Sequence, residues 1–126
     1  MAPMRRMVKE SMFSPVDPET GKIKYPAHAG DTPLGIVYTE HPNSGITIQG
    51  YQLPCVKEAI EMVKKAALVV PQVRYVGWDV AVTPNGPIII EGNTYCAHDF
   101  WQLPPHTPEK IGMLPTIMKI APEFKL

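Results

Sequence analysis

Residues 75–93, YVGWDVAVTPNGPIIIEGN, decide the fold of this chain. The segment has the pattern of two strands joined by a tight turn at Thr83-Pro84-Asn85-Gly86. Proline suits the first central position of a type I turn, asparagine suits the second, and glycine suits the left-handed position that closes a bulge. The segment therefore predicts a β-hairpin with a three-residue loop, in which Thr83 lies opposite Pro87.

This register gives the hairpin two chemically different faces, because side chains alternate along a strand. The apolar face carries Trp78, Val80, Val82, Ile88 and Ile90. The other face carries Gly77, Asp79, Ala81, Ile89, Glu91 and Asn93. The register also sets Asp79 opposite Glu91, with small neighbours that leave room for a ligand.

Asp79, Glu91 and Asn93 are the candidate ligands of one metal ion. Directly opposed side chains lie about 5 Å apart at Cβ, and like charges at that distance destabilise a sheet. A divalent cation would offset the repulsion, and Mg²⁺ is commonly held by one or two carboxylates together with phosphate oxygens. The alternative is an exposed hairpin with both carboxylates in water. The prediction depends on the loop, since a loop of two or four residues would shift the register and separate the acids.

A helix is predicted over residues 54–69, with Pro54 at its first position and Pro71 beyond its end. Apolar residues recur at four-three spacing along one stripe, which is expected to pack on the apolar face of the hairpin. They are Val56, Ile60, Val63, Ala67 and Val70. On the opposite face, Glu61 and Lys65 have the order that favours an ion pair.

The remaining segments predict short elements. Turns are expected at residues 16–21 and 41–45, short strands at 22–25, 35–39 and 46–48, and a loop over 26–34. A second helix is expected with Thr107 as its N-cap and Pro108 at its first position, running to residue 117 or 118, and Pro115 is expected to kink or shorten it. His28 and His106 are expected to be exposed in loops. His98 and Asp99 either contact a phosphate or bond locally.

Length and composition exclude several classes of protein. A chain of 126 residues suits one domain, and its 12 basic and 12 acidic residues balance, so nucleic acid is not expected as a partner. The two cysteines show no metal or disulfide spacing and are expected to be free thiols. No stretch has the roughly 20 apolar residues of a membrane span, and no secretory signal is evident, so the expected location is cytoplasmic.

The motif GWDVAVTPNGPIIIEGN resembles the metal-binding hairpin of the ATP-grasp superfamily. VDPETGKI from Val16 and HPNSGITIQGYQLP from His41 are similar to the branch of that superfamily associated with sugar transfer. The resemblance covers residues 16–102. Proteins of this branch occur in the biosynthesis of cell-surface polysaccharides.

The resemblance implies an α+β fold, an antiparallel sheet with flanking helices, similar to the C-terminal metal-binding subdomain of an ATP-grasp protein. Residues 16–126 would form this partial domain, and residues 1–15 a tail or irregular segment. Asp79, Glu91 and Asn93 would bind the Mg²⁺ of ATP, and a small carboxylate substrate would be phosphorylated in a ligase-type reaction. The catalytic residues and the residues that contact the nucleotide stay unassigned.

The chain also departs from the family pattern. A complete ATP-grasp fold has an upstream lobe with lysines over the phosphates, an adenine pocket and a Gly-rich flap, and this sequence begins too late to contain it. Residues 1–14 contain no glycine where the branch tends to have one. Two expectations follow: an enzyme that the missing lobe completes, or a non-catalytic remnant that acts as an interaction or oligomerisation module. Apolar surface left uncovered would favour a homo-oligomer.

Overall fold

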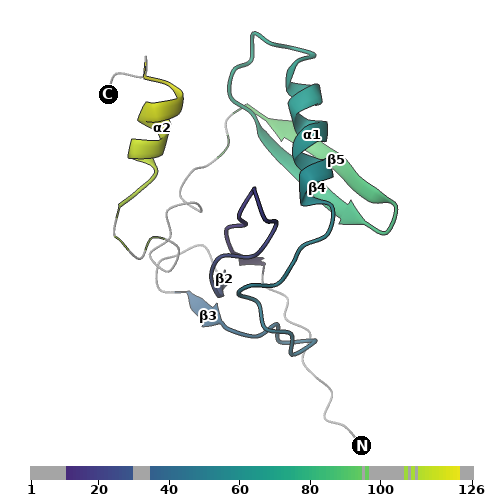
Figure 1. Cartoon of the computed structure of the whole chain (residues 1–126), viewed down its shortest axis with the longest axis vertical. Coiled ribbons are helices and arrows are strands. Elements are labelled where there is room, and N and C mark those ends of the chain that lie inside the picture. Colours follow the sequence, from purple (N-terminus) through teal and green to yellow (C-terminus); the bar gives the residue numbers. More distant parts are fainter. Residues whose placement is uncertain are drawn as a thin grey trace, which may run out of the picture. The chain divides into compact units, whose positions relative to one another are not determined.

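The computed structural model describes residues 11–29, 35–94, 96, 107, 109 and 111–122 (Figure 1). The chain divides into two units. One comprises residues 1–15, 25–49 and 98–126, and the other comprises residues 16–24 and 50–97. The described elements are two helices and five strands in two antiparallel sheets, which confirms the predicted α+β class. The division into residues 1–15 and 16–126 stays a prediction.

The first unit contains a three-stranded antiparallel sheet in which β2 (Ala27–Ala29) lies between β1 (Met12–Phe13) and β3 (Ile36–Tyr38). The central strand is buried throughout, with 5%, 0% and 2% of its three residues exposed. The prediction of a loop over residues 26–34 is therefore wrong at β2. The expected strand at 35–39 is confirmed as β3.

His28 is completely buried in β2, so the expectation of an exposed histidine is wrong. It pairs with Phe13 on one side and with Val37 on the other. A Cβ atom on Gly35 would lie only 2.5 Å from Cε1 of the His28 ring. Gly35 thus admits the ring where a larger residue would meet it.

The turn at residues 41–45 is confirmed by a hydrogen bond from Gly45 N to His41 O of 2.7 Å. The strand expected at 46–48 is reduced to a single bridge between Thr47 and Glu40. Helix α2 spans Leu114–Ile120, later than predicted, and Pro115 lies in its first turn instead of kinking it. A proline in the first turn costs nothing because its missing N–H would have no partner within the helix.

The second unit begins with the predicted turn at residues 16–21. The Asp17 carboxylate accepts hydrogen bonds from the backbone N–H groups of Glu19 and Thr20, and these bonds hold the pKa of Asp17 below its usual 3.8. The strand expected at 22–25 is present only as isolated bridges, one of which joins Lys22 to Gln52.

Helix α1 spans Val56–Ala67, two residues shorter at each end than predicted. Cys55 is its N-cap in a left-handed conformation with φ of 58°, so Pro54 precedes the helix. The apolar stripe is half-buried from Val56 to Ala67, and the charged face is exposed. Glu61 pairs with Lys64 at 3.4 Å, whereas the sequence predicted Lys65.

A hairpin of β4 (Gly77–Thr83) and β5 (Gly86–Asn93) completes the second unit. Helix α1 contacts both strands, as Figure 1 shows, which confirms the predicted packing of the helix on the hairpin. Within the described part of the chain, neither helix is long and apolar enough to cross a membrane.

Candidate metal-binding site on the hairpin

The tip of the hairpin is tighter than predicted. Thr83 pairs with Gly86, so only Pro84 and Asn85 form the loop, and the prediction of Thr83 opposite Pro87 is wrong by one residue. The Thr83 hydroxyl donates to Gly86 O at 2.7 Å and accepts from Asn85 N at 3.2 Å. Gly86 has the predicted left-handed backbone, with φ of 108°. Local side-chain bonding by Thr83 therefore favours the shorter loop.

A β-bulge reverses this shift before the acids are reached. Val80 pairs with Ile89 and Asp79 pairs with Glu91, so Ile90 is the extra residue of β5. An extra residue on one strand displaces the register by one position. Asp79 and Glu91 are thus opposite each other, as predicted, although the loop is shorter than predicted.

The shorter loop changes the composition of the two faces between the tip and the bulge. Ile89 pairs with Val80 on the apolar face, and Ile88 pairs with Ala81 on the face of the acids, so the predicted faces of these two isoleucines are exchanged. Ile88 is exposed and Ile89 is half-buried, in agreement with this arrangement. The face of the acids therefore carries Ile88 in place of the predicted Ile89, and its other predicted members are unchanged.

Asn93 lies on the same side of β5 as Glu91. Its side-chain Nδ2 donates a hydrogen bond of 3.1 Å to Oε1 of Glu91. Both acids are exposed and Asn93 is half-buried. Carboxylate and amide oxygens are the ligands that hard cations such as Mg²⁺ prefer. The hairpin thus gathers three oxygen-bearing side chains at its open end.

At two glycines of this end, the side chain of another residue lies against the backbone, in the space that a Cβ atom would need. A Cβ on Gly92 would lie 2.9 Å from Cζ3 of Trp78, the residue paired with Gly92 across the strands. A Cβ on Gly77 would lie 2.6 Å from the Cβ of Cys96. Neither contact was predicted from the sequence, although the register of the hairpin, extended by one pair, sets Trp78 opposite Gly92.

The model of the family described as sugar-transfer associated ATP-grasp matches residues 9–113. The chain belongs to this family. Membership indicates an ATP-binding, ligase-like function for this ATP-grasp chain. The match extends beyond residues 16–102, over which the resemblance was seen in the sequence. No curated protein and no solved structure matches the chain.

Within the described ranges, this ATP-grasp chain has no group of three or more His, Cys, Asp or Glu side chains placed to hold a metal ion. The hairpin contributes only two side chains of these four types, Asp79 and Glu91, because its third candidate ligand, Asn93, is an asparagine. His98, Asp99 and His106 lie outside the described residues.

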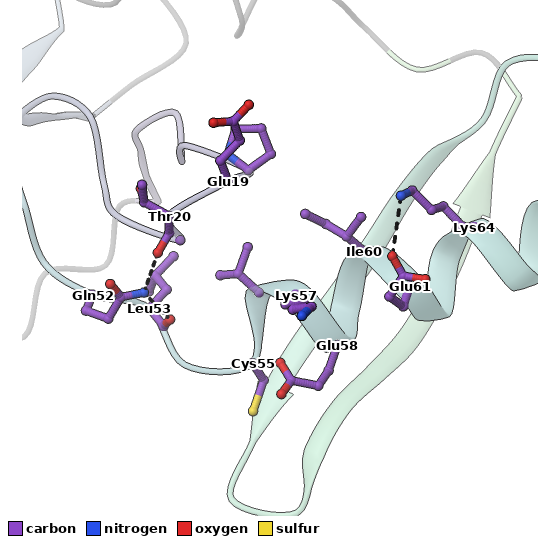
Figure 2. Close-up of a pocket in the computed structure, with 13 residues that line it drawn as sticks. Glu19, Thr20, Gln52, Leu53, Cys55, Lys57, Glu58, Ile60, Glu61 and Lys64 are labelled. Atoms are coloured by element: carbon purple, nitrogen blue, oxygen red, sulfur yellow. Dashed lines mark hydrogen bonds and ion pairs between the residues drawn. The ribbon is translucent and has the colours of Figure 1, made fainter.

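A hollow of about 460 Å³ lies elsewhere in the second unit of the ATP-grasp chain, between the turn at residues 18–21 and helix α1 (Figure 2). Figure 2 shows Glu19 and Thr20 on one side and Ile60 and Lys64 on the helix. Asp79, Glu91 and Asn93 do not line it. The candidate ligands are thus on an exposed part of the hairpin and not in this hollow.

Proposed function

We propose that the hairpin binds Mg²⁺ through Asp79, Glu91 and Asn93 and thereby holds the phosphates of ATP. The observation that carries the proposal is the register of β4 and β5, in which Asp79 pairs with Glu91 although the loop is one residue shorter than predicted. Two opposed carboxylates repel each other and weaken a sheet unless a cation lies between them. A divalent ion bound here would remove that cost.

Asn93 can serve the site in two ways at once. Its amide N–H donates to Glu91 Oε1, which orients the carboxylate. A side-chain amide also has a carbonyl oxygen with two lone pairs, which remains available as a ligand. The exposure of Asp79 and Glu91 leaves room for the triphosphate on the other side of the ion. Mg²⁺ in proteins typically completes its octahedron with phosphate oxygens and water.

The reaction proposed is the phosphorylation of a small carboxylate by ATP, followed by attack of an amine or thiol on the acyl phosphate. The role of Asp79, Glu91 and Asn93 in it is to bind and orient the metal–nucleotide complex; a bound Mg²⁺ would neutralise charge on the transferred phosphoryl group. The family description, sugar-transfer associated, supports a role in the biosynthesis of cell-surface polysaccharides.

Calorimetric titration of the full chain with ATP and Mg²⁺ tests the proposal. We expect saturable binding by the parent chain, and a loss of about tenfold or more in affinity for Asp79→Asn and for Glu91→Gln, because each change removes one anionic ligand. Glu58→Gln is the matched control, since Glu58 is an exposed carboxylate on α1. Absence of saturable binding by the parent, or equal losses in all three variants, would contradict the proposal.

A second candidate is a non-catalytic interaction or oligomerisation module. It is favoured by apolar side chains that the second unit leaves exposed directly after α1, with Leu68 and Val69 exposed by 75% and 79%. Ile90 in the bulge is exposed by 65%. Exposed apolar patches of this kind mark surfaces that associate with a partner. The partner proposed is a second copy of this chain.

A further inference from the structure

Gly77 occupies a special position in the candidate site, because it pairs with Asn93 across the hairpin. The Cys96 side chain rests on it. A Cβ on Gly77 would lie 2.6 Å from Cβ and 2.8 Å from Sγ of Cys96, and 3.8 Å from the backbone oxygen of Asn93. Distances below 3.0 Å are essentially never found for a real Cβ. Only glycine therefore allows Cys96 to lie where it does.

This contact ties down the end of β5. Cys96 follows Asn93 by three positions, and it returns to the strand residue that pairs with Asn93. Asn93 is thereby held by the ladder, and Cys96 by its contact with Gly77, the residue that pairs with Asn93.

Tyr75 provides a second hold on Cys96. Its phenol hydroxyl forms a hydrogen bond with the Cys96 sulfur, and Cys96 itself is half-buried. Partial burial of the phenol and this hydrogen bond raise the pKa of Tyr75 to about 12. The Cys96 thiol is thus held by two residues, the backbone of Gly77 and the phenol of Tyr75.

We propose that Gly77 is a positioning residue that acts through Cys96 on Asn93, so that the Asn93 amide meets Glu91 in the geometry needed for the metal ion. This inference rests on the proposed function and adds a residue to it that is not itself a ligand. Metal ligands must be held within about 0.5 Å of the productive geometry by the residues that support them.

An alanine at position 77 would disturb this geometry for a definite reason. The clashing atom of Cys96 closest to the new methyl group is its Cβ, which is bonded to the backbone and cannot swing away like the end of a flexible side chain. Position 96 would move by several tenths of an ångström, and the chain connects it to Asn93 through only two residues. Glu91 would then lose its 3.1 Å hydrogen bond from Asn93.

Mn²⁺ binding to the full chain, followed by electron paramagnetic resonance, tests this inference, because carboxylate and carbonyl sites accept Mn²⁺ in place of Mg²⁺. Gly77→Ala is expected to weaken Mn²⁺ binding by about tenfold, the size of effect seen when the support of a metal ligand is lost. The double variant Gly77→Ala/Cys96→Gly removes the clashing atoms and is expected to regain most of the affinity. Thermal unfolding of each variant is measured in parallel.

Gly45→Ala is the matched control. Gly45 has φ of 71° and nothing within 4 Å of its added Cβ, so the change strains the backbone without a clash, in the unit that does not contain the hairpin. It is expected to lower the stability and to leave Mn²⁺ binding unchanged. A second readout is the side-chain amide signal of Asn93 in NMR spectra without metal, identified by its loss in Asn93→Asp. This signal should shift in Gly77→Ala and return in the double variant.

The possible results separate the two proposals. Absence of Mn²⁺ binding by the parent chain would overturn the proposed function and this inference with it. Binding by the parent together with unchanged binding and an unchanged Asn93 signal in Gly77→Ala would overturn the inference alone. A loss in Gly77→Ala that Cys96→Gly does not relieve would also overturn it, because the effect would then not pass through Cys96.

Discussion

Tyr75 places its phenol hydroxyl against the thiol of Cys96 although 49% of the residue is exposed. Burial of part of the ring disfavours the charged phenolate, and the hydrogen bond to sulfur favours the neutral phenol. Both effects raise the pKa of Tyr75 from 10.0 to about 12. A raised pKa in the folded state means that the contribution of Tyr75 to stability is complete below pH 10 and is lost as the pH rises toward 12.

We therefore expect tyrosinate absorbance in an alkaline titration of the parent chain to include a late step near pH 12. Tyr75→Phe should remove that step, and Cys96→Ala should move it toward pH 10. Tyr51→Phe is the control, because Tyr51 is an exposed tyrosine and should not contribute to the late step. A late step that persists in Tyr75→Phe would show that the contact with Cys96 does not hold the phenol.

At the scale of single residues, the sequence predicted the left-handed Gly86 from local turn chemistry. It also predicted the pairing of Asp79 with Glu91, but from a loop one residue too long, and the bulge at Ile90 restores that pairing. It did not predict the contact of Cys96 with Gly77, since Cys96 lies beyond the end of the ladder and no periodicity places it. Nor did it predict the burial of His28. Two alanines flank that residue, and alanine gives little indication of strand or core.

At the scale of elements, the hairpin contains two departures from regular geometry that cancel. The loop is one residue shorter than predicted, and β5 contains one residue more than a regular ladder needs. A register count from the sequence assumes a regular ladder, so it gave the correct partner of Asp79 and the wrong partner of Val80. Helix α1 was easier to predict because its stripe repeats over three turns, and only its ends differ, as is usual for helix boundaries.

Thr83 is expected to stabilise the tip of the hairpin through its hydroxyl, which bonds to Gly86 O and Asn85 N. Thr83→Val keeps the shape and the β-branching and removes these bonds, so the free energy of unfolding in urea should fall by about 1 kcal/mol. Thr83→Ser retains the hydroxyl and should lose less. Equal losses in the two variants would contradict a role of the hydroxyl in fixing the two-residue loop.

At the scale of the whole molecule, the first unit was the least predictable part. Its three strands have two or three residues each, and β2 pairs with residues 15 or 17 positions earlier in β1 and 7 to 11 positions later in β3. Such short strands have no measurable alternation, and their pairing depends on contacts distant in sequence. The second unit, by contrast, contains two of the motifs on which the family resemblance was based, the hairpin and VDPETGKI, whereas the motif from His41 to Pro54 belongs to both units.

Self-association through the exposed apolar residues after α1 is expected to appear in sedimentation velocity as a concentration-dependent shift to a dimer or larger species. The double change Leu68→Ser/Val69→Ser should restore the monomer, because it removes two of the most exposed apolar side chains. Lys65→Ser is the control on the charged face of α1. A parent chain that stays monomeric at every concentration would contradict the oligomerisation module.

The bulge at Ile90 has a consequence for anyone who redesigns the hairpin. If the loop at the tip is shortened or lengthened by one residue, Asp79 stays opposite Glu91 only when a strand of the hairpin gains or loses one residue to compensate. The two changes are neutral together and harmful apart, so mutational scans made one position at a time would misjudge both. A redesigned hairpin should therefore keep constant the number of residues from Asp79 to Glu91, counted along the chain through the tip.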